Sequence, residues 1–435
     1  MTYKYHQLKN IFSSEFNFPF TFQFLHSRAI IYFAACLLSV VSQGAGSLSI
    51  YAGTGGTGSY FPDSTWVKQL DMVEVLGRAF HVRSKPDSIR YKGNGPFVSV
   101  IPIVGYAMNS GLTGGLTTST SFFTSPEKNK FSNIMANAFY SQYQQYWMIA
   151  TSNVFIEKLK IHIFGDWRYY KFPTKTFGIG TESSANDEVN IDYSYLRIYQ
   201  LVFHEFAPNV FGGIGYNLDY HWNISSNIDS GLVVDQIRKY QKGTSTISSG
   251  ISLNFQFDNR ENAVNPNRGT FINLQYRPNF TFLGSNQNWQ SLLLEARQYF
   301  PLPATSNNTL AFWSYNDFTL HGNPPYLDLP SNGWDDYSNT GRGYLQGRYT
   351  GNNFIYLESE YRFSLSRNGL FGAVVFGNAE TYLTKIPSQM QLVIPGGGIG
   401  FRLKMNKKSN TNLAIDYGFG INGSRGLFFN LGEVF

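Results

Sequence analysis

The chain has 435 residues, a formal net charge of +6, 17% aromatic residues and only 14% charged residues. Its 38 Phe and 29 Tyr exclude a disordered chain, and its mean hydropathy of -0.23 is too low for a bundle of membrane helices. A transmembrane β-barrel explains both values, because polar lumen-facing residues alternate with apolar lipid-facing residues and cancel in an average. The sequence has no lysine and arginine tract of the kind that binds nucleic acid.

The only long apolar run, Ala29 to Val41, is too short to span a bilayer as a helix, which needs about 20 residues. With Arg28 before it, this run predicts a signal peptide over residues 1-42. Cleavage there would remove Cys36, the only cysteine, and would lower the net charge, since the segment holds three basic residues and one acidic residue. The alternative is a lipoprotein signal at Cys36, which the apolar residues beyond that cysteine disfavour.

Residues 43-95 form a predicted periplasmic leader. It begins with the flexible sequence GSLSIYAGTGGTGSY, whose glycines lack both the preceding strand and the GK[ST] of a phosphate-binding loop. From Trp66 to Phe80 the apolar side chains follow the spacing of one short amphipathic helix. We expect this helix to flank or plug the barrel mouth.

From residue 96 to residue 435, strand-sized segments alternate with turn residues, which predicts an all-β fold. The predicted class is a closed antiparallel transmembrane β-barrel of about 16 strands with both chain ends in the periplasm. The longest predicted loop runs from Gly322 to Gly351, and long loops of such barrels face outward. The strands are expected at residues 97-106, 111-123, 131-140, 145-156, 159-171, 191-206, 209-224, 244-258, 269-283, 288-300, 308-321, 352-366, 369-383, 393-405, 411-420 and 425-435.

The expected strand at 352-366 shows the alternation most clearly. Leu357 and its apolar neighbours fall on one face, while Glu358, Glu360 and Arg362 fall on the other. The apolar face is therefore predicted to meet lipid and the charged face to meet the lumen. A soluble β-sandwich also alternates, but it would carry fewer outward aromatic residues and would need a second domain to use this length.

Four stretches resemble the BamA/TamA-like superfamily of outer-membrane insertases and two-partner secretion transporters, also called the bacterial surface antigen family. Residues 257–276, FDNRENAVNPNRGTFINLQY, resemble its periplasmic hairpin, and residues 341–349, GRGYLQGRY, resemble the arginine-glycine-aromatic motif of its sixth extracellular loop. LAIDYGFG with GLFFNLGEVF resembles the last hairpin. GPFVSVIPIVGYAMNSGLTGG resembles the opening strand pair of members without large N-terminal modules.

The resemblance implies that Arg342, with Gly343 and Tyr344, folds back into the lumen and that the arginine docks on acidic side chains. Glu358 and Glu360 are the lumen-facing candidates by strand parity. A carboxylate can accept a guanidinium group bidentately, which suits a charge inside a narrow lumen. The alternative is an arginine that stays solvated in a loop turn.

The sequence departs from the family pattern at Asn378, where the family usually carries an aspartate. Either Asn378 or Glu380, two residues further on, is a candidate to substitute in the ion pair. Asp416, on the lumen face of its strand, is a further candidate partner, although one polar lumen residue among many is an equally good interpretation.

The barrel is predicted to close through a weak seam between its first and last strands. Pro102 in the first strand lacks an N–H, and Gly432 near the end of the last strand lacks a side chain to pack. Unpaired backbone groups are costly in lipid, so a poorly bonded seam is a natural site for lateral opening. The alternative is that Pro102 marks a bulge in an ordinary closed barrel.

The final strand also carries a predicted C-terminal signal for the assembly machinery. The resemblance assigns it to apolar residues of one parity, with Glu433 interrupting the row: Leu427, Phe429, Leu431 and Phe435.

The resemblance implies a bacterial outer-membrane barrel that assists insertion or translocation of polypeptides, or of lipid. The alternative function is a passive pore or structural barrel. The expected partners are outer-membrane lipid and a polypeptide substrate or periplasmic partner, since a leader of this length is barely enough for a fragment of the family's substrate-binding repeats. No cofactor, metal or enzyme activity is expected, because no metal-ligand spacing or nucleophile motif accompanies the histidines outside the signal. These are His81, His162, His204, His221 and His321.

Overall fold

The computed structural model describes a barrel and a small part of the leader. The described residues are 69–72, 74, 75, 96–107, 110–124, 131–241, 243–304, 306–336, 338–383, 392–407 and 410–435. The predicted signal peptide and most of the predicted leader helix lie outside them, although Met72, Glu74 and Val75 are helical. Within the described residues, no helix has the length and apolar character needed to cross a membrane.

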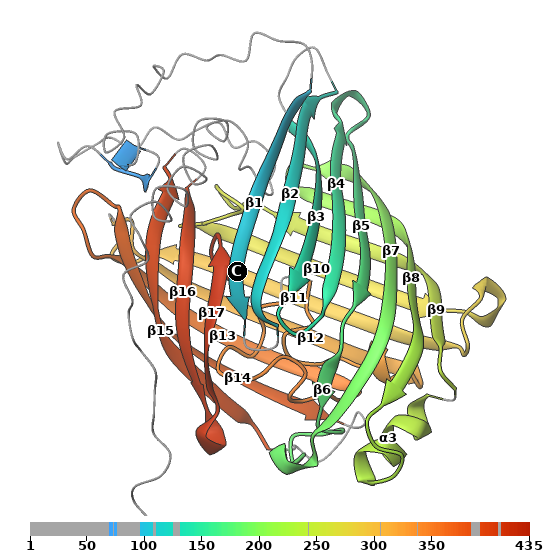
Figure 1. Ribbon diagram of the computed structural model, residues 1–435. Coiled ribbons are helices and arrows are strands. Elements are labelled where there is room, and N and C mark those ends of the chain that lie inside the picture. The colour runs from blue at the N-terminus through green and yellow to red at the C-terminus, as the bar shows by residue number, and fades with distance from the viewer. Residues whose placement is uncertain are drawn as a thin grey trace, which may run out of the picture.

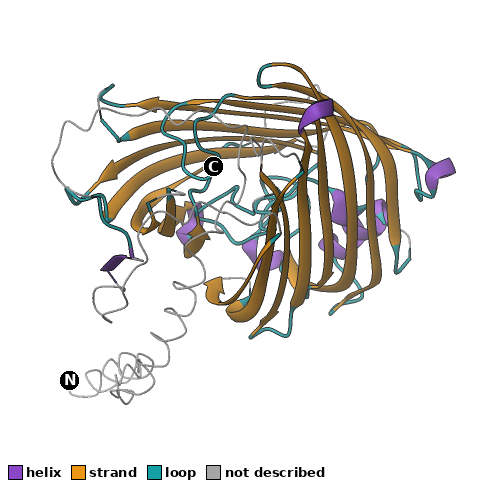
Figure 2. Cartoon of the chain, turned by 90° about the horizontal axis from the view of Figure 1, so that it is seen from above, coloured by secondary structure: helices purple, strands orange, loops and turns teal. Residues whose placement is uncertain are grey.

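Antiparallel strands form a nearly closed barrel (Figures 1 and 2). Nearly every ladder joins strands that follow one another along the chain, which is the pattern of hairpins connected by turns. The strands are β1 (Phe97–Ala107), β2 (Gly111–Phe123), β3 (Phe131–Ser141), β4 (Tyr146–Ile156), β5 (Ile161–Lys171), β6 (Thr174–Thr176), β7 (Val189–Ala207), β8 (Val210–Ser226), β9 (Thr246–Asp258), β10 (Gly269–Asn279), β11 (Trp289–Pro301), β12 (Thr309–Gly322), β13 (Asn353–Ser364), β14 (Phe371–Leu383), β15 (Ile394–Asn406), β16 (Thr411–Gly420) and β17 (Arg425–Leu431).

The three-residue strand β6 continues β5. Both strands pair antiparallel with β7, and the interruption between them contains Pro173, which has no N–H to donate to a ladder. Since β5 and β6 occupy one place in the wall, the 17 strands of the sheet make 16 segments around the barrel. This arrangement confirms the predicted all-β barrel of about 16 antiparallel strands.

Side chains alternate between lipid and lumen along the strands, as the sequence pattern predicts. On β13, Leu357 is 54% exposed, whereas its neighbour Glu358 is 3% exposed and Glu360 is fully buried. Successive side chains of a strand point to opposite faces, so the charged row of β13 turns into the lumen.

The two ends of the barrel differ in their connections. We call the end where β1 begins and β17 finishes the terminal end, and the opposite end the loop end. Connections at the terminal end include the tight turn between β7 and β8. The loop end carries the helix α3 (Leu232–Tyr240) and the connection 323–352, which folds back into the barrel (Figure 2). We call residues 323–352 the lumen loop.

The strands β1 and β17 lie side by side, with Cα atoms within 8 Å (Figure 1). Among the described ladders, β1 pairs with β2 and β17 pairs with β16, and none joins β1 to β17. The ladder between β1 and β2 passes through Pro102, opposite Leu116, without a register shift. Pro102 therefore does not interrupt the pairing of β1 with β2.

The last strand is shorter than the predicted strand at 425–435. It ends at Leu431, and Gly432 follows with a φ of +105°. This conformation is open to glycine and strained for other residues, so Gly432 is where the chain leaves the barrel wall.

Candidate functional site

The lumen loop is ordered by its own hydrogen bonds before it meets the wall. Asp335 Oδ1 accepts hydrogen bonds from the backbone N–H of Asn339 at 3.0 Å and of Thr340 at 2.8 Å. A bridge joins Ser331 to Thr350 and brings the two limbs of the loop together. Turns in which an aspartate accepts backbone hydrogen bonds can fix a loop that has no regular secondary structure. This turn directly precedes residues 341–344, which meet the wall.

Arg342 reaches from this loop to two strands of the wall. Its guanidinium contacts Glu358 and Glu360 on β13, and its Nη1 lies 2.6 Å from Asp416 Oδ2 on β16. The guanidinium also lies over the ring of Phe376 on β14, with Cζ 3.7 Å from the ring centroid. The contact thus spans β13, β14 and β16, and every charged atom in it is shielded from solvent.

Further charges, which the sequence reasoning did not assign to the site, complete this network. Arg402 of β15 contacts Asp416 and lies 2.7 Å from Glu433, and Arg362 of β13 lies 2.7 Å from Glu360. Three arginines therefore alternate with four carboxylates. A buried charge needs such a partner, because removing one side of a buried pair costs about 3–5 kcal/mol.

Gly343 and Tyr344 hold the loop against β15, β16 and the turn that follows β16. Gly343 has a φ of +116°, and a Cβ there would lie 2.6 Å from the carbonyl oxygen of Phe419. The hydroxyl of Tyr344 donates to the carbonyl of Pro395 and accepts from the N–H of Ile421 at 2.9 Å. The glycine allows the close approach, and the tyrosine fixes it.

Asn378 and Glu380, the two residues predicted to replace the family's aspartate in the ion pair with Arg342, contact other groups. Asn378 Nδ2 donates to the backbone carbonyl of Arg342 at 2.9 Å, and it does not meet the guanidinium. Glu380 accepts a hydrogen bond from the hydroxyl of Tyr382 at 3.1 Å. The predicted substitution in the ion pair is therefore wrong for both residues, and Asp416 on β16 contributes the further carboxylate.

The chain end folds into the lumen, contrary to the predicted strand. Leu427, Phe429 and Leu431 face outward, with Phe429 40% exposed, but Phe435 is 3% exposed and does not share their face. The predicted parity fails because the turn at Gly432 ends the strand period.

The buried chain end is held by both aromatic and polar contacts. The ring of Phe435 stacks on Trp313 with centroids 5.2 Å apart, and the backbone oxygen of Phe435 accepts from Arg362 Nη2 at 2.9 Å. Glu433, expected to interrupt an apolar row, instead accepts from Asn412 Nδ2 at 2.6 Å and pairs with Arg402. The C-terminus thereby joins the network around Arg342.

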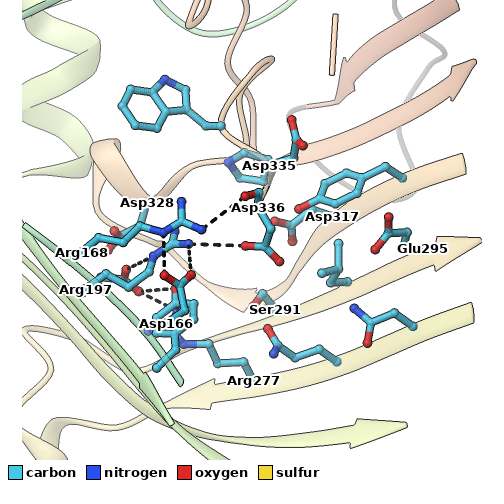
Figure 3. Close-up of a pocket in the computed structure, with 18 of the residues that line it drawn as sticks. Asp166, Arg168, Arg197, Arg277, Ser291, Glu295, Asp317, Asp328, Asp335 and Asp336 are labelled. Atoms are coloured by element: carbon cyan, nitrogen blue, oxygen red, sulfur yellow. Dashed lines mark hydrogen bonds and ion pairs between the residues drawn. The ribbon is translucent and has the colours of Figure 1, made fainter. Parts of the chain in front are cut away.

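The other side of the lumen is hollow. A cavity of about 340 Å³ lies between the lumen loop and the wall formed by strands from β3 to β12 (Figure 3). Basic side chains line one side of it, and acidic side chains of the loop and of β11 and β12 face them. Figure 3 labels the arginines Arg168, Arg197 and Arg277, and the carboxylates Asp166, Glu295, Asp317, Asp328, Asp335 and Asp336.

Sequence reasoning missed the basic wall, although strand parity carries a signal for it. Asp166 and Arg168 are two residues apart on β5, so they share a face, and their side chains pair at 2.8 Å. Which face is the lumen, and which strands lie beside each other, become clear only from the assembled barrel.

Within the described part of the chain, no group of three or more His, Cys, Asp or Glu residues is placed to hold a metal ion. Arginines and carboxylates instead form ion pairs between the loop and the wall.

No family model and no curated protein matches the sequence. Solved structures of other proteins share the fold, and three of them follow. BamA from Haemophilus ducreyi lacking POTRA domains 1-3 has a TM-score of 0.52 at 14% identity, over 77% of this chain and 68% of that one. CdiB from Escherichia coli has a TM-score of 0.53 at 12% identity, over 77% and 61%. CdiB from Acinetobacter baumannii has a TM-score of 0.50 at 13% identity, over 78% and 60%. The chain thus spans about three fifths of either CdiB chain, and it has the β-barrel fold of BamA and CdiB.

Proposed function

We propose that the chain is a bacterial outer-membrane barrel that assists insertion or translocation of polypeptides, or of lipid. In this proposal the terminal end faces the periplasm and the lumen loop enters from the cell surface. A polypeptide substrate or periplasmic partner meets the terminal end. The protein is not an enzyme in this proposal and uses no cofactor.

The observation that carries the proposal is the combination of an anchored lumen loop with a seam that lacks a ladder in the described residues. Arg342 fixes the loop on β13 and β16, close to the last strand, while β1 and β17 are joined by none of the described ladders. A closed, passive barrel has no physical reason to leave strand edges unpaired in lipid, where each unpaired backbone group costs several kcal/mol. An edge that can open gives such groups a partner in an incoming strand.

Apart from the short last strand β17, the wall strands are long enough to cross the membrane. Strands such as β2 and β9 have 13 residues, and a tilted transmembrane strand needs about 9–11 residues. Their lipid-facing residues are apolar, as with Leu112 and Leu116 of β2. These features support a location in the outer membrane.

A reconstitution assay tests the proposal. Purified full-length protein in liposomes should speed the folding of a second, urea-unfolded β-barrel compared with empty liposomes, as followed by heat-modifiable migration. A matched control is the same protein with its lumen loop released by Arg342→Ala, which should accelerate folding less. Equal client folding with and without the protein would contradict the proposal.

A passive pore is the second candidate, favoured by the cavity of about 340 Å³ beside the lumen loop. Steady conductance in planar bilayers without any acceleration of client folding would support the pore. Client folding without steady conductance would support the insertase.

A further inference from the structure

The basic wall of the cavity has one more arginine than it has aspartates to pair with them. Five charged side chains meet there, from β5, β7, β8 and β10: Asp166, Arg168, Arg197, Asp219 and Arg277. Each of these side chains is at most 15% exposed. Three arginines against two aspartates leave the wall in need of one more carboxylate.

The lumen loop supplies that carboxylate through Asp336. Its Oδ1 lies 3.4 Å from Arg197 Nη1, and its backbone carbonyl accepts from Arg168 Nη2 at 3.3 Å (Figure 3). Asp336 is also 52% exposed at its side chain, unlike the buried partners of Arg342. Long contacts to an exposed carboxylate are weak, because solvent screens them.

Two other loop carboxylates near this wall contact different groups. Asp335 accepts hydrogen bonds from backbone N–H groups of the loop itself. Asp328 accepts from Ser248 Oγ at 2.6 Å and lies 3.6 Å from His221 Nδ1. Arg277 is also fully engaged within the wall, since its Nη1 lies 2.7 Å from Asp219 Oδ2 and its Nε donates to Asn279. Asp336 therefore contacts Arg168 and Arg197 and does not contact Arg277.

We propose that Arg168 and Arg197 form a binding site for an acidic residue of a polypeptide in the lumen, and that Asp336 occupies this site in the resting protein. The geometry favours a polypeptide over a simple anion. One arginine contacts a carboxylate and the other contacts the peptide carbonyl of the same residue, so the pair engages an aspartyl residue within a chain.

A polypeptide that binds at this site displaces the part of the lumen loop around Asp336. An acidic residue of a polypeptide replaces Asp336 with no change of net charge at the wall. The loop then loses the contacts of Asp336 with Arg168 and Arg197, while Arg342 keeps its contacts with β13 and β16. This inference rests on the proposed handling of polypeptides, and it names acidic segments as the part of the substrate that the cavity retains.

Peptide binding to the full chain in detergent micelles tests the site. We expect fluorescently labelled hexa-aspartate to bind, measured by anisotropy at low salt, and hexa-asparagine to bind at least about tenfold more weakly, because the arginines contribute through charge. Asp336→Asn removes the internal competitor and should tighten hexa-aspartate binding severalfold. Arg197→Gln should weaken it by about tenfold, and Arg168→Gln by less, since Arg168 contacts the carbonyl.

Matched controls lie on α3, outside the lumen. Asp235→Asn and Arg238→Gln make the same charge changes at side chains that are 73% and 61% exposed. They should leave the affinity unchanged. Arg197→Lys, which keeps the charge, should retain part of the affinity, and heat-modifiable migration checks that each variant is folded.

Several outcomes would overturn the proposal. Equal affinities for the aspartate and asparagine peptides would show that charge is not recognised. Unaltered binding by Asp336→Asn would show that this residue is not the resting occupant. The assay needs no membrane and no client protein, so a failure of liposome insertion with intact peptide binding would contradict the proposed function alone.

Discussion

The two sides of the lumen differ in how they hold the same loop. On the side of β13 to β16, Arg342 is enclosed by carboxylates and by the ring of Phe376, and the buried chain end packs nearby. On the side of β5 to β10, a cavity separates loop and wall, and the half-exposed Asp336 bridges them at 3.4 Å. Two charged contacts of the loop therefore differ in kind: Arg342 is a buried anchor, and Asp336 is a half-exposed contact.

Burial explains the difference in strength. A buried ion pair cannot exchange its partner for water without leaving a charge in a low-dielectric site, whereas an exposed pair can. Motion of the loop should therefore begin at Asp336 and pivot about Arg342. Four substitutions test this difference, beginning with the largest expected effect.

Replacing Arg342 should have the largest effect. Arg342→Ala leaves Glu358, Glu360 and Asp416 with one cation fewer, a loss of about 3–5 kcal/mol of loop attachment. We expect a heat-modifiable barrel whose lumen loop is cut by protease and whose conductance is raised. Wild-type proteolysis and conductance in this variant would contradict a fixed anchor.

The second largest effect is expected when the side chain of the last residue is shortened. Phe435→Ala removes a buried ring from its stack on Trp313 and should destabilise the folded barrel by about 3 kcal/mol, measured by urea unfolding in micelles. Leu427→Ala on the outward face of β17 is the matched control and should cost much less, because detergent covers that face. Equal losses in both variants would show that Phe435 is not a lumen residue.

A smaller effect is expected at Gly343. Gly343→Ala places a Cβ 2.6 Å from the Phe419 carbonyl oxygen at a φ of +116°, and strain of this kind costs about 1–3 kcal/mol. The loop should shift away from β16 and become more sensitive to protease than in the wild type. Gly369→Ala, with a φ of +69° and open space around it, controls for backbone strain alone.

The smallest effect on stability is expected at the weak contact. Asp336→Asn should change unfolding by less than about 1 kcal/mol, since half-exposed pairs contribute little. Its effect should appear in conductance fluctuations, which should become more frequent as the part of the loop around residue 336 loses its contacts with Arg168 and Arg197. A stability loss as large as that of Arg342→Ala would remove the distinction between the two sides.

The strands were predictable from sequence because alternation is a local property. The expected strand at 352–366 and the observed β13 agree to within two residues, and the lumen-facing side of Glu358 and Glu360 follows from parity. The interruption within β5 and β6 had its own signal in Pro173.

The chain end was not predictable in the same way. Residues 425–431 keep the period of a strand, and the glycine at 432 changes the direction of everything after it. Parity carried past that glycine placed Phe435 on the lipid face, which is wrong. A single residue in the left-handed region outweighs the pattern of the residues around it.

The cavity wall depends on contacts between strands that are distant in sequence. Arg277 of β10 meets Asp219 of β8, and Asp336 of the lumen loop meets Arg197 of β7. Such contacts depend on the order of the strands and on their register. The alternation pattern within one strand predicts neither of them.

We expect the seam between β1 and β17 to open when the protein handles a polypeptide, and a reversible crosslink across the seam tests this opening. Cysteine pairs placed across β1 and β17 can be oxidised to a disulfide once Cys36, the only natural cysteine, is replaced. The rate at which the reconstituted protein folds a client barrel is then measured before and after reduction. If the seam opens, oxidation should abolish the acceleration of client folding, and reduction should restore it. Equal acceleration in the oxidised and reduced states would contradict opening at the seam.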